Sequence, residues 1–190
     1  MRMIILGAPG AGKGTQAASI ATALGIPTIS TGAMFRENIQ NGTALGKKVQ
    51  DLLAAGQYVS DEITNEMLFE RLSRDDTSGG FLLDGYPRTL SQVDALDAWL
   101  AERDQKIDCV LELTVDTEAV VDRLLKRAEI EGRADDTEAV IRDRQQIYAQ
   151  ETEPLTRVYG ERGVLVEVDG MGEIDEVAAR VRQAVDRVAA

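Results

Sequence analysis

The stretch GAPGAGKGT, residues 7–15, decides the fold. It follows the apolar run MIIL at residues 3–6, and a helical pattern begins at Lys13. Glycines let successive backbone N–H groups turn toward one point, the helix start adds its positive dipole end, and the lysine adds a point charge for phosphates. A glycine-rich turn without a ligand is the alternative, but it gives no reason for a lysine at this offset. The stretch therefore predicts a phosphate-binding loop.

Outward from this loop, short apolar runs alternate with helical patterns. Buried strands are expected at residues 3–6, 80–84, 109–113 and 164–168, with a weaker one at 26–30. Helices are expected at residues 13–24, 90–102, 117–127 and 138–159, and Val177, Val181, Val185 and Val188 predict the apolar face of a last helix. Because strands and helices alternate, we expect an α/β fold with a doubly wound parallel five-stranded sheet.

Two segments interrupt the alternation. Residues 31–75 contain three helical stretches in succession, separated by glycines and without a strand, so we expect an inserted helical subdomain. Residues 128–136, AEIEGRADD, are polar and lie between two helices, which predicts a mobile loop or a small lid.

The composition limits the class of protein. A chain of 190 residues is expected to form one domain with insertions, and it has no apolar stretch long enough for a membrane span. The N-terminal run is too short for a signal peptide, so we expect a cytoplasmic protein. The net charge of −12 argues against nonspecific binding to nucleic acid or anionic lipid. The single cysteine, Cys109, is expected to be a buried apolar residue.

The residue after the lysine favours some nucleotide-binding classes over others. Most phosphate loops have a serine or threonine there as a direct magnesium ligand, whereas this chain has Gly14, followed by Thr15. We therefore expect Mg²⁺ to be held through phosphate oxygens and water, with the carboxylate of Asp84 behind the water. This departure argues against GTPases and motor ATPases.

Four motifs in register, GAPGAGKGTQ, STGAMFR, GFLLDGYPRTLSQ and GRADD, resemble the adenylate kinase family across nearly the whole chain. The resemblance implies reversible phosphoryl transfer from Mg-ATP to AMP, giving two ADP, with a role in adenine nucleotide homeostasis. It also implies a short lid without structural zinc, and a monomer whose partners are the small nucleotides ATP, AMP and ADP. The implied division is a core at residues 1–29, 61–125 and 137–190, a nucleoside-monophosphate (NMP)-binding insertion at 30–60 and a lid at 126–136.

For the AMP site, an arginine just past a strand end can fork onto a phosphate, and Arg88 has that position. The resemblance makes Arg88 and Arg36 ligands of the AMP phosphate and Gln92 the reader of the adenine edge. Without it, Gln92 and Arg36 would be read as ordinary surface residues. The remaining AMP-binding residues that it implies are Thr31, Gln57, Tyr58, Val59, Gly85, Tyr86, Pro87, Arg133 and Arg144.

For ATP, the resemblance implies the loop residues Gly10, Ala11, Gly12, Lys13, Gly14 and Thr15, with Arg123, Arg127 and Gly172. Arg123 and Arg127 are four residues apart and share a helix face, which by spacing alone is usually a solvated face. Gly172 could equally belong to a simple strand-to-helix turn. The implied catalytic set is Lys13, Arg88, Arg123, Arg133 and Arg144, whereas Arg142 should point away. The absence of histidine fits a reaction without a general base.

Two alternatives and two departures remain. A UMP/CMP kinase shares the fold, but Thr31 and Gln92 favour adenine, and a non-catalytic nucleotide-binding switch would not need a second phosphate site. The family usually has aspartate where this chain has Ala33, which puts a local helix-start interaction or an arginine-orienting interaction in doubt. The segment from Lys126 to Glu131 is less glycine-rich than expected, which predicts a stiffer hinge.

Overall fold

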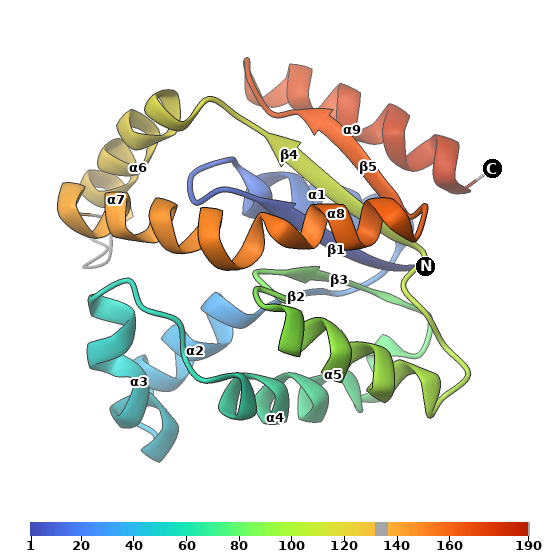
Figure 1. The fold of residues 1–190 in the computed structure, drawn as a ribbon, viewed down its shortest axis with the longest axis horizontal. Coiled ribbons are helices and arrows are strands. Elements are labelled where there is room, and N and C mark those ends of the chain that lie inside the picture. The colour runs from blue at the N-terminus through green and yellow to red at the C-terminus, as the bar shows by residue number, and fades with distance from the viewer. Residues whose placement is uncertain (132–136, 190) are drawn as a thin grey trace.

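The computed structural model describes residues 1–131 and 137–189, and its centre is a five-stranded parallel sheet (Figure 1). The strand order is β2-β3-β1-β4-β5, and every neighbouring pair is parallel. The strands are β1 (Arg2–Gly7), β2 (Thr28–Ser30), β3 (Phe81–Asp84), β4 (Cys109–Thr114) and β5 (Leu165–Asp169). The predicted doubly wound α/β sheet is therefore confirmed, including its weakest strand.

Nine α-helices are assigned within the described residues. They are α1 (Lys13–Leu24), α2 (Thr31–Gln40), α3 (Ala44–Ala54), α4 (Asp61–Leu72), α5 (Leu90–Ala101), α6 (Thr117–Glu131), α7 (Glu138–Ile147), α8 (Pro154–Glu161) and α9 (Ile174–Ala189). A 3₁₀ turn lies at Asp75–Thr77, and a π-helical segment, Tyr148–Thr152, joins α7 to α8.

Alternation along the strands divides the core into two layers. Ile4 and Leu6 of β1 pack in one cluster with residues of α4, α5 and α8, whereas Met3 and Ile5 pack on the other face with α1 and α9. Cys109 belongs to the second cluster and is fully buried, as predicted. Because both faces are covered by helices, β1 is buried and its carboxyl end is fixed at the centre of the sheet.

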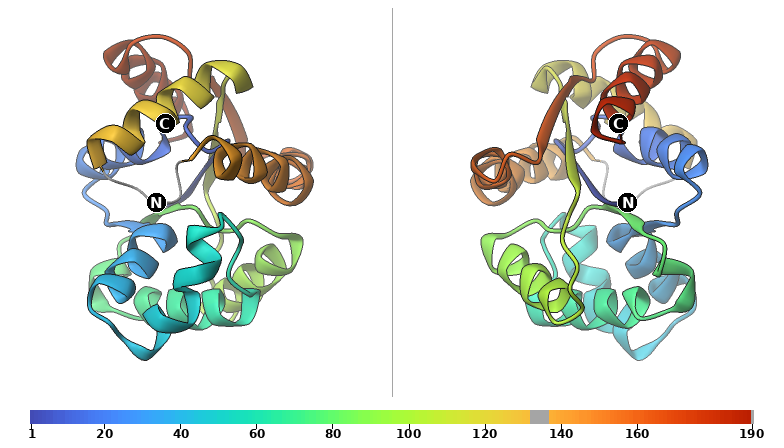
Figure 2. Two further views of the ribbon diagram at one scale, coloured as in Figure 1. Left: turned by 90° about the vertical axis from the view of Figure 1, so that its left-hand side faces the viewer. Right: turned by 90° about the vertical axis from the view of Figure 1, so that its right-hand side faces the viewer.

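In the sheet, β3 and β2 lie on one side of β1, and β4 and β5 lie on the other side. The direction in which strands are added therefore reverses beside β1. Ligands of open α/β sheets bind outside the carboxyl ends of the strands at such a point. Two helical arms flank this end of the sheet on opposite sides, α2 with α3 and α6 with α7 (Figures 1 and 2). Each arm has a small apolar cluster of its own, centred on Phe35, Val49 and Val59 in the first and on Val121, Leu124 and Ile141 in the second.

Three sequence predictions need correction. Helix α6 continues to Glu131, so residues 128–131 are helical rather than a loop, because alanine and glutamate are strong helix formers. The helix expected at residues 138–159 is divided by the π-helical segment before Pro154. Val188, in the last turn of α9, is 36% exposed, whereas Val177, Val181 and Val185 are buried. The remainder of the expected lid, residues 132–136, lies outside the described residues.

Ser30 caps the start of α2, where this chain has Ala33 in place of the aspartate that is usual in the family. The side chain of Ser30, at the end of β2, accepts a hydrogen bond from the backbone N–H of Ala33 at 3.4 Å. This serine cap satisfies one of the first N–H groups of the helix, so the helix begins without an aspartate. Among the helices within the described residues, none combines the length and the apolar composition required to cross a bilayer.

Candidate active site

The phosphate loop connects β1 to α1 at the carboxyl edge of the sheet. Gly7, Gly10 and Gly12 have φ angles of 144°, 89° and 87°, a region that side-chain-bearing residues rarely adopt. Gly12 immediately precedes α1 and has no side chain to cap it, so the first N–H groups of the helix can face an anion. The strand, loop and helix that the sequence predicted are confirmed.

Gly10 brings α6 close to this loop. A Cβ atom at Gly10 would lie 2.9 Å from Cγ of Leu124 and 3.0 Å from Cβ of Val120, both buried on α6. Only glycine permits this approach without displacing the helix. The close packing places Arg123, which neighbours Leu124, at the edge of the loop.

Lys13 and a glutamine from α7 fix the shape of the loop. The ammonium group of Lys13 donates to the carbonyl oxygens of Gly7 at 2.6 Å and Ala8 at 2.9 Å, so it lies over the loop. Nε2 of Gln145 donates to the carbonyl oxygen of Pro9 at 2.8 Å. The sequence analysis missed Gln145, because its contact joins residues 136 positions apart.

A cavity of about 580 Å³ lies in front of the loop and collects cationic side chains from separate elements. Its described lining includes Gly10, Gly12, Lys13, Gly14, Thr15, Arg36, Asp84, Gly85, Arg88, Arg123 and Arg144. Four arginines and one lysine therefore meet in a protein whose net charge is −12. Such a concentration of positive charge holds an anionic ligand locally, against the field of the whole chain.

Arg88 is held in place by several partners. Its Nε donates to the carbonyl oxygen of Gly85 at 2.8 Å, and its guanidinium carbon lies 4.8 Å from the ring centroid of Tyr58. The hydroxyl of Thr152 donates to the carbonyl oxygen of Arg88 at 2.9 Å and also lies 2.9 Å from the hydroxyl of Tyr58. Thr152 is a further residue that the sequence analysis missed.

A second hollow adjoins Arg88 and contains the residues predicted to read the AMP base. It is lined by Thr31, Gly32, Phe35, Leu53, Gln57, Tyr58, Val59, Thr64, Gly85, Arg88 and Gln92. Thr31 and Gln92 are each 2% exposed, so Gln92 is a buried residue and the surface-residue reading of it is wrong. The Thr31 hydroxyl donates to the carbonyl oxygen of Gly85 at 2.8 Å.

The neighbouring residues of the DGYPRT motif have different positions. Pro87 lines a third hollow with Lys13, Arg144 and Tyr148. Tyr86 is fully buried, and its hydroxyl donates to Oδ1 of Asn65 at 2.7 Å and to the carbonyl oxygen of Gln92 at 3.1 Å. Its side chain therefore supports the pocket from within the core.

Tyr148 lines this third hollow, and burial governs the protonation state of its hydroxyl. Burial, followed by the charges of Glu112 and Glu153, raises the pKa of Tyr148 above its ordinary value. Its hydroxyl therefore stays neutral at physiological pH.

The arginines of the second arm approach the cavity from α6 and α7. Arg123 lines the cavity, and its guanidinium lies 3.5 Å from the carbonyl oxygen of Gly170. Arg144 lines it from α7, close to the end of α3, because a Cβ at Gly56 would lie 2.8 Å from Cγ of Arg144. The two arms therefore meet at Arg144. Arg127 lies on α6, where only its backbone is described, and Arg133 lies outside the described residues.

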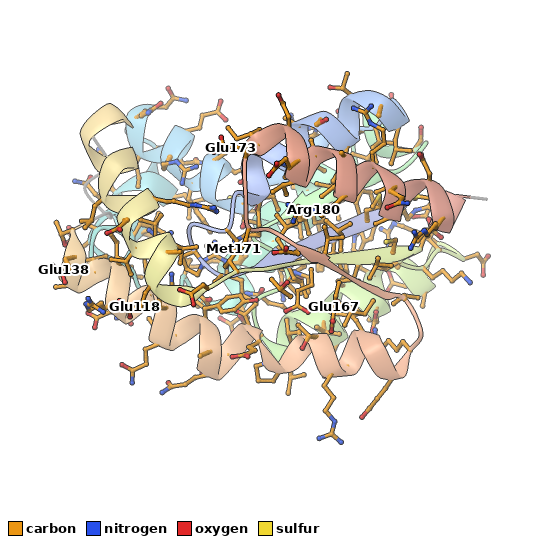
Figure 3. All side chains as sticks on the ribbon, turned by 90° about the horizontal axis from the view of Figure 1, so that it is seen from above. Glu118, Glu138, Glu167, Met171, Glu173 and Arg180 are labelled. Atoms are coloured by element: carbon orange, nitrogen blue, oxygen red, sulfur yellow. The ribbon has the colours of Figure 1, made fainter. Side chains whose placement is uncertain are left out.

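Arg142 points away from the cavity, as predicted. It pairs with Glu138 on its own helix at 3.1 Å and approaches Glu118 of α6 at 3.8 Å. Figure 3 labels both glutamates. Both ion pairs are exposed, so each contributes at most about 1 kcal/mol, and only the pair with Glu118 joins α7 to α6.

The loop after β5 contains Gly172, whose φ of 110° favours glycine. Arg180 of α9 donates to the carbonyl oxygens of Asp169 and Met171, and its bond to Met171 is 2.6 Å long (Figure 3). The carboxylate of Glu176 accepts from the backbone N–H of Glu173 at 3.2 Å. The loop is thus tied to α9 by Arg180 and Glu176, neither of which the sequence analysis selected.

Among the described residues that line the cavity, Asp84 is the acidic one. Its Oδ2 would lie 3.8 Å from a Cβ built on Gly14, so the carboxylate faces the phosphate loop. Within the described ranges 1–131 and 137–189, no cluster of three or more histidine, cysteine or acidic side chains could hold a metal ion.

Comparison with known proteins agrees with this geometry. Residues 5–164 match the family model described as adenylate kinase. An adenylate kinase of Leifsonia xyli is 57% identical over 179 residues, covering 94% of this chain and 90% of the relative. One from a Nocardioides species is 54% identical, covering 98% and 97%, and one from Thermobifida fusca is 50% identical, covering 97% and 98%.

Proposed function

Because this chain belongs to the adenylate kinase family, we propose how its own residues divide the work of phosphoryl transfer. The protein is a phosphotransferase that moves a phosphoryl group from ATP to AMP and gives two ADP. One observation carries the proposal: the phosphate loop and four arginines from separate elements line a single cavity.

The donor half of the site binds ATP through the phosphate loop. The backbone N–H groups from Gly10 to Thr15 and the ammonium group of Lys13 bind the donor phosphates. Lys13 already lies over the loop, so it exchanges its bonds to loop carbonyl oxygens for bonds to phosphate oxygens. Arg123 binds the same phosphates, with Arg127 beside it on α6. The donor adenine lies against the backbone at Gly172, in the loop that Arg180 holds.

The acceptor half binds AMP between the first arm and the core. Arg36 and Arg88 bind its phosphate, because both guanidinium groups line the cavity. The base enters the adjoining hollow, where Gln92 reads its edge and Thr31 lies beside it. The backbone of residues 57–59 and 85–87 forms the walls.

The transfer step needs alignment and charge neutralisation rather than proton abstraction. The attacking oxygen belongs to the AMP phosphate, which is anionic at neutral pH, so a general base is unnecessary. Lys13, Arg88, Arg123 and Arg144, with Arg133 from the lid, neutralise the charge that spreads over the transferring group. Mg²⁺ bound to the donor phosphates supplies further charge neutralisation, and Asp84 orients one of its water ligands.

Closure must exclude water, because otherwise the enzyme would hydrolyse ATP. We assign this role to the lid at residues 126–136 and to the NMP-binding insertion at 30–60, which move against the core at 1–29, 61–125 and 137–190. The separate apolar cluster around Phe35 and Val49 supports this division, since the insertion packs around a small core of its own.

The base pocket supports AMP over pyrimidine acceptors. Thr31 and Gln92 line the same hollow and offer hydrogen bonds to a purine edge. A coupled assay of ADP formation with AMP, UMP, CMP and GMP tests the assignment. AMP should give the largest kcat/KM, and faster phosphorylation of UMP or CMP would contradict it.

We also propose that the protein acts as a monomer in the cytoplasm, where it maintains the balance of adenine nucleotides. The high negative charge, which opposes self-association and nucleic-acid binding, supports this proposal. Sedimentation at concentrations around those of the assay tests the oligomeric state, and a dimeric mass would contradict it.

A further inference from the structure

Asp61, the first residue of α4, forms two hydrogen bonds beside the base pocket. Its Oδ1 accepts from Nε2 of Gln92 at 2.6 Å, and its Oδ2 accepts from the hydroxyl of Thr89 at 2.8 Å. Thr89 is the cap residue of α5, and its hydroxyl also accepts from the backbone N–H of Gln92 at 3.1 Å. Asp61 is therefore bonded to the proposed base reader directly and to its backbone through Thr89.

These contacts fix which way the amide of Gln92 points. Its Oε1 accepts from the backbone N–H of Arg88 at 2.7 Å, while its Nε2 donates to Asp61. If the amide were rotated by 180°, Nε2 would face the N–H of Arg88, and Oε1 would face a carboxylate oxygen. Two donors and two acceptors would then oppose each other in a site that is 2% exposed, which is unfavourable on both sides.

The fixed amide has a defined polarity toward the pocket. A side-chain amide has two lone pairs and two N–H groups, so one acceptor position on Oε1 and one donor position on Nε2 are left for a ligand. A 6-aminopurine offers an N–H at position 6 and an acceptor at N1, which match this pair. A 6-oxopurine offers an acceptor at position 6 and an N–H at N1, which oppose it. An amide free to rotate would pair equally well with either base.

We propose that Asp61 is a positioning residue that determines acceptor specificity. Its carboxylate holds the Gln92 amide in the orientation that accepts a 6-aminopurine monophosphate and rejects a 6-oxopurine monophosphate. The proposal rests on the proposed role of Gln92 as the base reader.

A matched control is available one residue along the chain. Asp61 and Glu62 both lie in the first turn of α4, where acidic side chains interact favourably with the helix dipole. Asp61→Asn and Glu62→Gln remove the same charge from the same turn, and Glu62 is exposed. A difference between the two variants therefore reports the contact with Gln92 rather than the stability of the helix.

The experiment measures kcat/KM for AMP and for IMP, the KM for ATP and the Tm, in the parent, Asp61→Asn, Glu62→Gln and Gln92→Leu. We expect Asp61→Asn to lower the AMP-to-IMP ratio of kcat/KM by about tenfold or more, since asparagine replaces a charge-assisted hydrogen bond by a neutral one and can pair with either orientation of the Gln92 amide. The KM for ATP and the ratio in Glu62→Gln should change less than about twofold. Asp61→Ser, which keeps a short polar residue at the helix start, repeats the test if the asparagine variant is too unstable to assay.

Two outcomes would overturn the inference, and they are distinguishable. If Gln92→Leu raises the KM for AMP but the Asp61 variants keep the parent ratio, Asp61 does not set the orientation and only this inference fails. If Gln92→Leu changes neither the KM for AMP nor the ratio, then Gln92 does not read the base, and its proposed role fails together with this inference. A lower ratio in the Asp61 variants alone supports it.

Discussion

In the phosphate loop the backbone forms most of the binding surface, whereas in the acceptor-base pocket side chains are proposed to read the base. The loop obtains its shape from Gly7, Gly10 and Gly12 at positive φ and from the start of α1. The pocket obtains its shape from hydrogen bonds that join α4 to α5 through Asp61, Thr89 and Gln92.

The difference separates two tasks of the enzyme. Backbone N–H groups bind phosphates, which every nucleotide carries, so the loop supplies charge and alignment. Side-chain amides and hydroxyls can distinguish one base from another, because they present donors and acceptors in a chosen order. Changes in the loop and its arginines should therefore reduce turnover, and changes in the pocket should alter the use of AMP.

The largest effect is expected from Lys13→Met. The substitution removes the point charge on the donor phosphates, so kcat should fall by roughly a thousandfold or more, comparable to the loss of an arginine finger. Lys106→Met, which changes an exposed lysine in the same way, should keep parent activity. Circular dichroism should show that both variants are folded. Substantial residual activity in Lys13→Met would mean that the loop does not bind the donor phosphates as proposed.

The second effect compares two arginines of α7. Arg144→Ala should lower kcat/KM by about 10³-fold, because Arg144 lines the cavity and stabilises charge in the transition state. Arg142 lies two residues away and pairs with Glu138 and Glu118, so Arg142→Ala should stay within about threefold of the parent. Similar losses in both variants would indicate a general disturbance of α7.

The arginine predicted from the lid motif has its own test. Arg133→Ala should reduce kcat strongly and leave the dissociation constant of AMP, measured without donor, nearly unchanged, because its contacts are expected only after closure. Isothermal titration with AMP alone and steady-state kinetics separate these quantities. Equal losses in binding and turnover would make Arg133 an ordinary acceptor-site ligand.

In the pocket, Gln92→Leu should raise the KM for AMP by about tenfold or more and leave the KM for ATP unchanged, since the adenine edge loses its partners at one site only. Gln183→Leu, an exposed position on α9, is the matched control. Initial rates with each nucleotide varied in turn give both constants. Equal effects on both nucleotides would place Gln92 outside the acceptor site.

The smallest effect is expected from Thr152→Val. It removes the hydroxyl that bonds to the carbonyl oxygen of Arg88 and lies beside the Tyr58 hydroxyl, so the KM for AMP should rise by about fivefold, the equivalent of one neutral hydrogen bond. Thr156→Val, which removes a hydroxyl that donates to the nearby carbonyl oxygen of Glu153, should have no such effect. A rise in the KM for ATP as well would assign Thr152 a wider structural role.

The sequence predicted what local patterns encode. Apolar runs predict the strands and the burial of Cys109, and glycines followed by a lysine predict the phosphate loop. The residues of each pattern lie close together in the sequence. The loop expected at residues 128–136 is wrong over residues 128–131, because the helix propensity of AEIE outweighs its polarity.

Contacts between residues that are distant in the sequence could not be predicted in this way. Asp61, Gln145, Thr152 and Arg180 act through partners 9 to 136 residues away, and only the folded arrangement of helices and loops brings them together. Arg36 and Gln92 were selected through the family resemblance, since their sequence neighbourhoods are those of surface residues. The roles of Arg127 and Arg133 stay predictions.

Gly56 affects the relative rates of the chemical step and of product release. It follows α3 with a φ of 71°, and a Cβ there would lie 2.8 Å from both Arg144 and Val140 of α7. Any larger residue would act as a wedge that holds the two arms apart. Such an enzyme would release its nucleotides sooner and complete the chemical step less often. The absence of a side chain at Gly56 therefore sets the balance between the time that nucleotides stay bound and the rate of turnover.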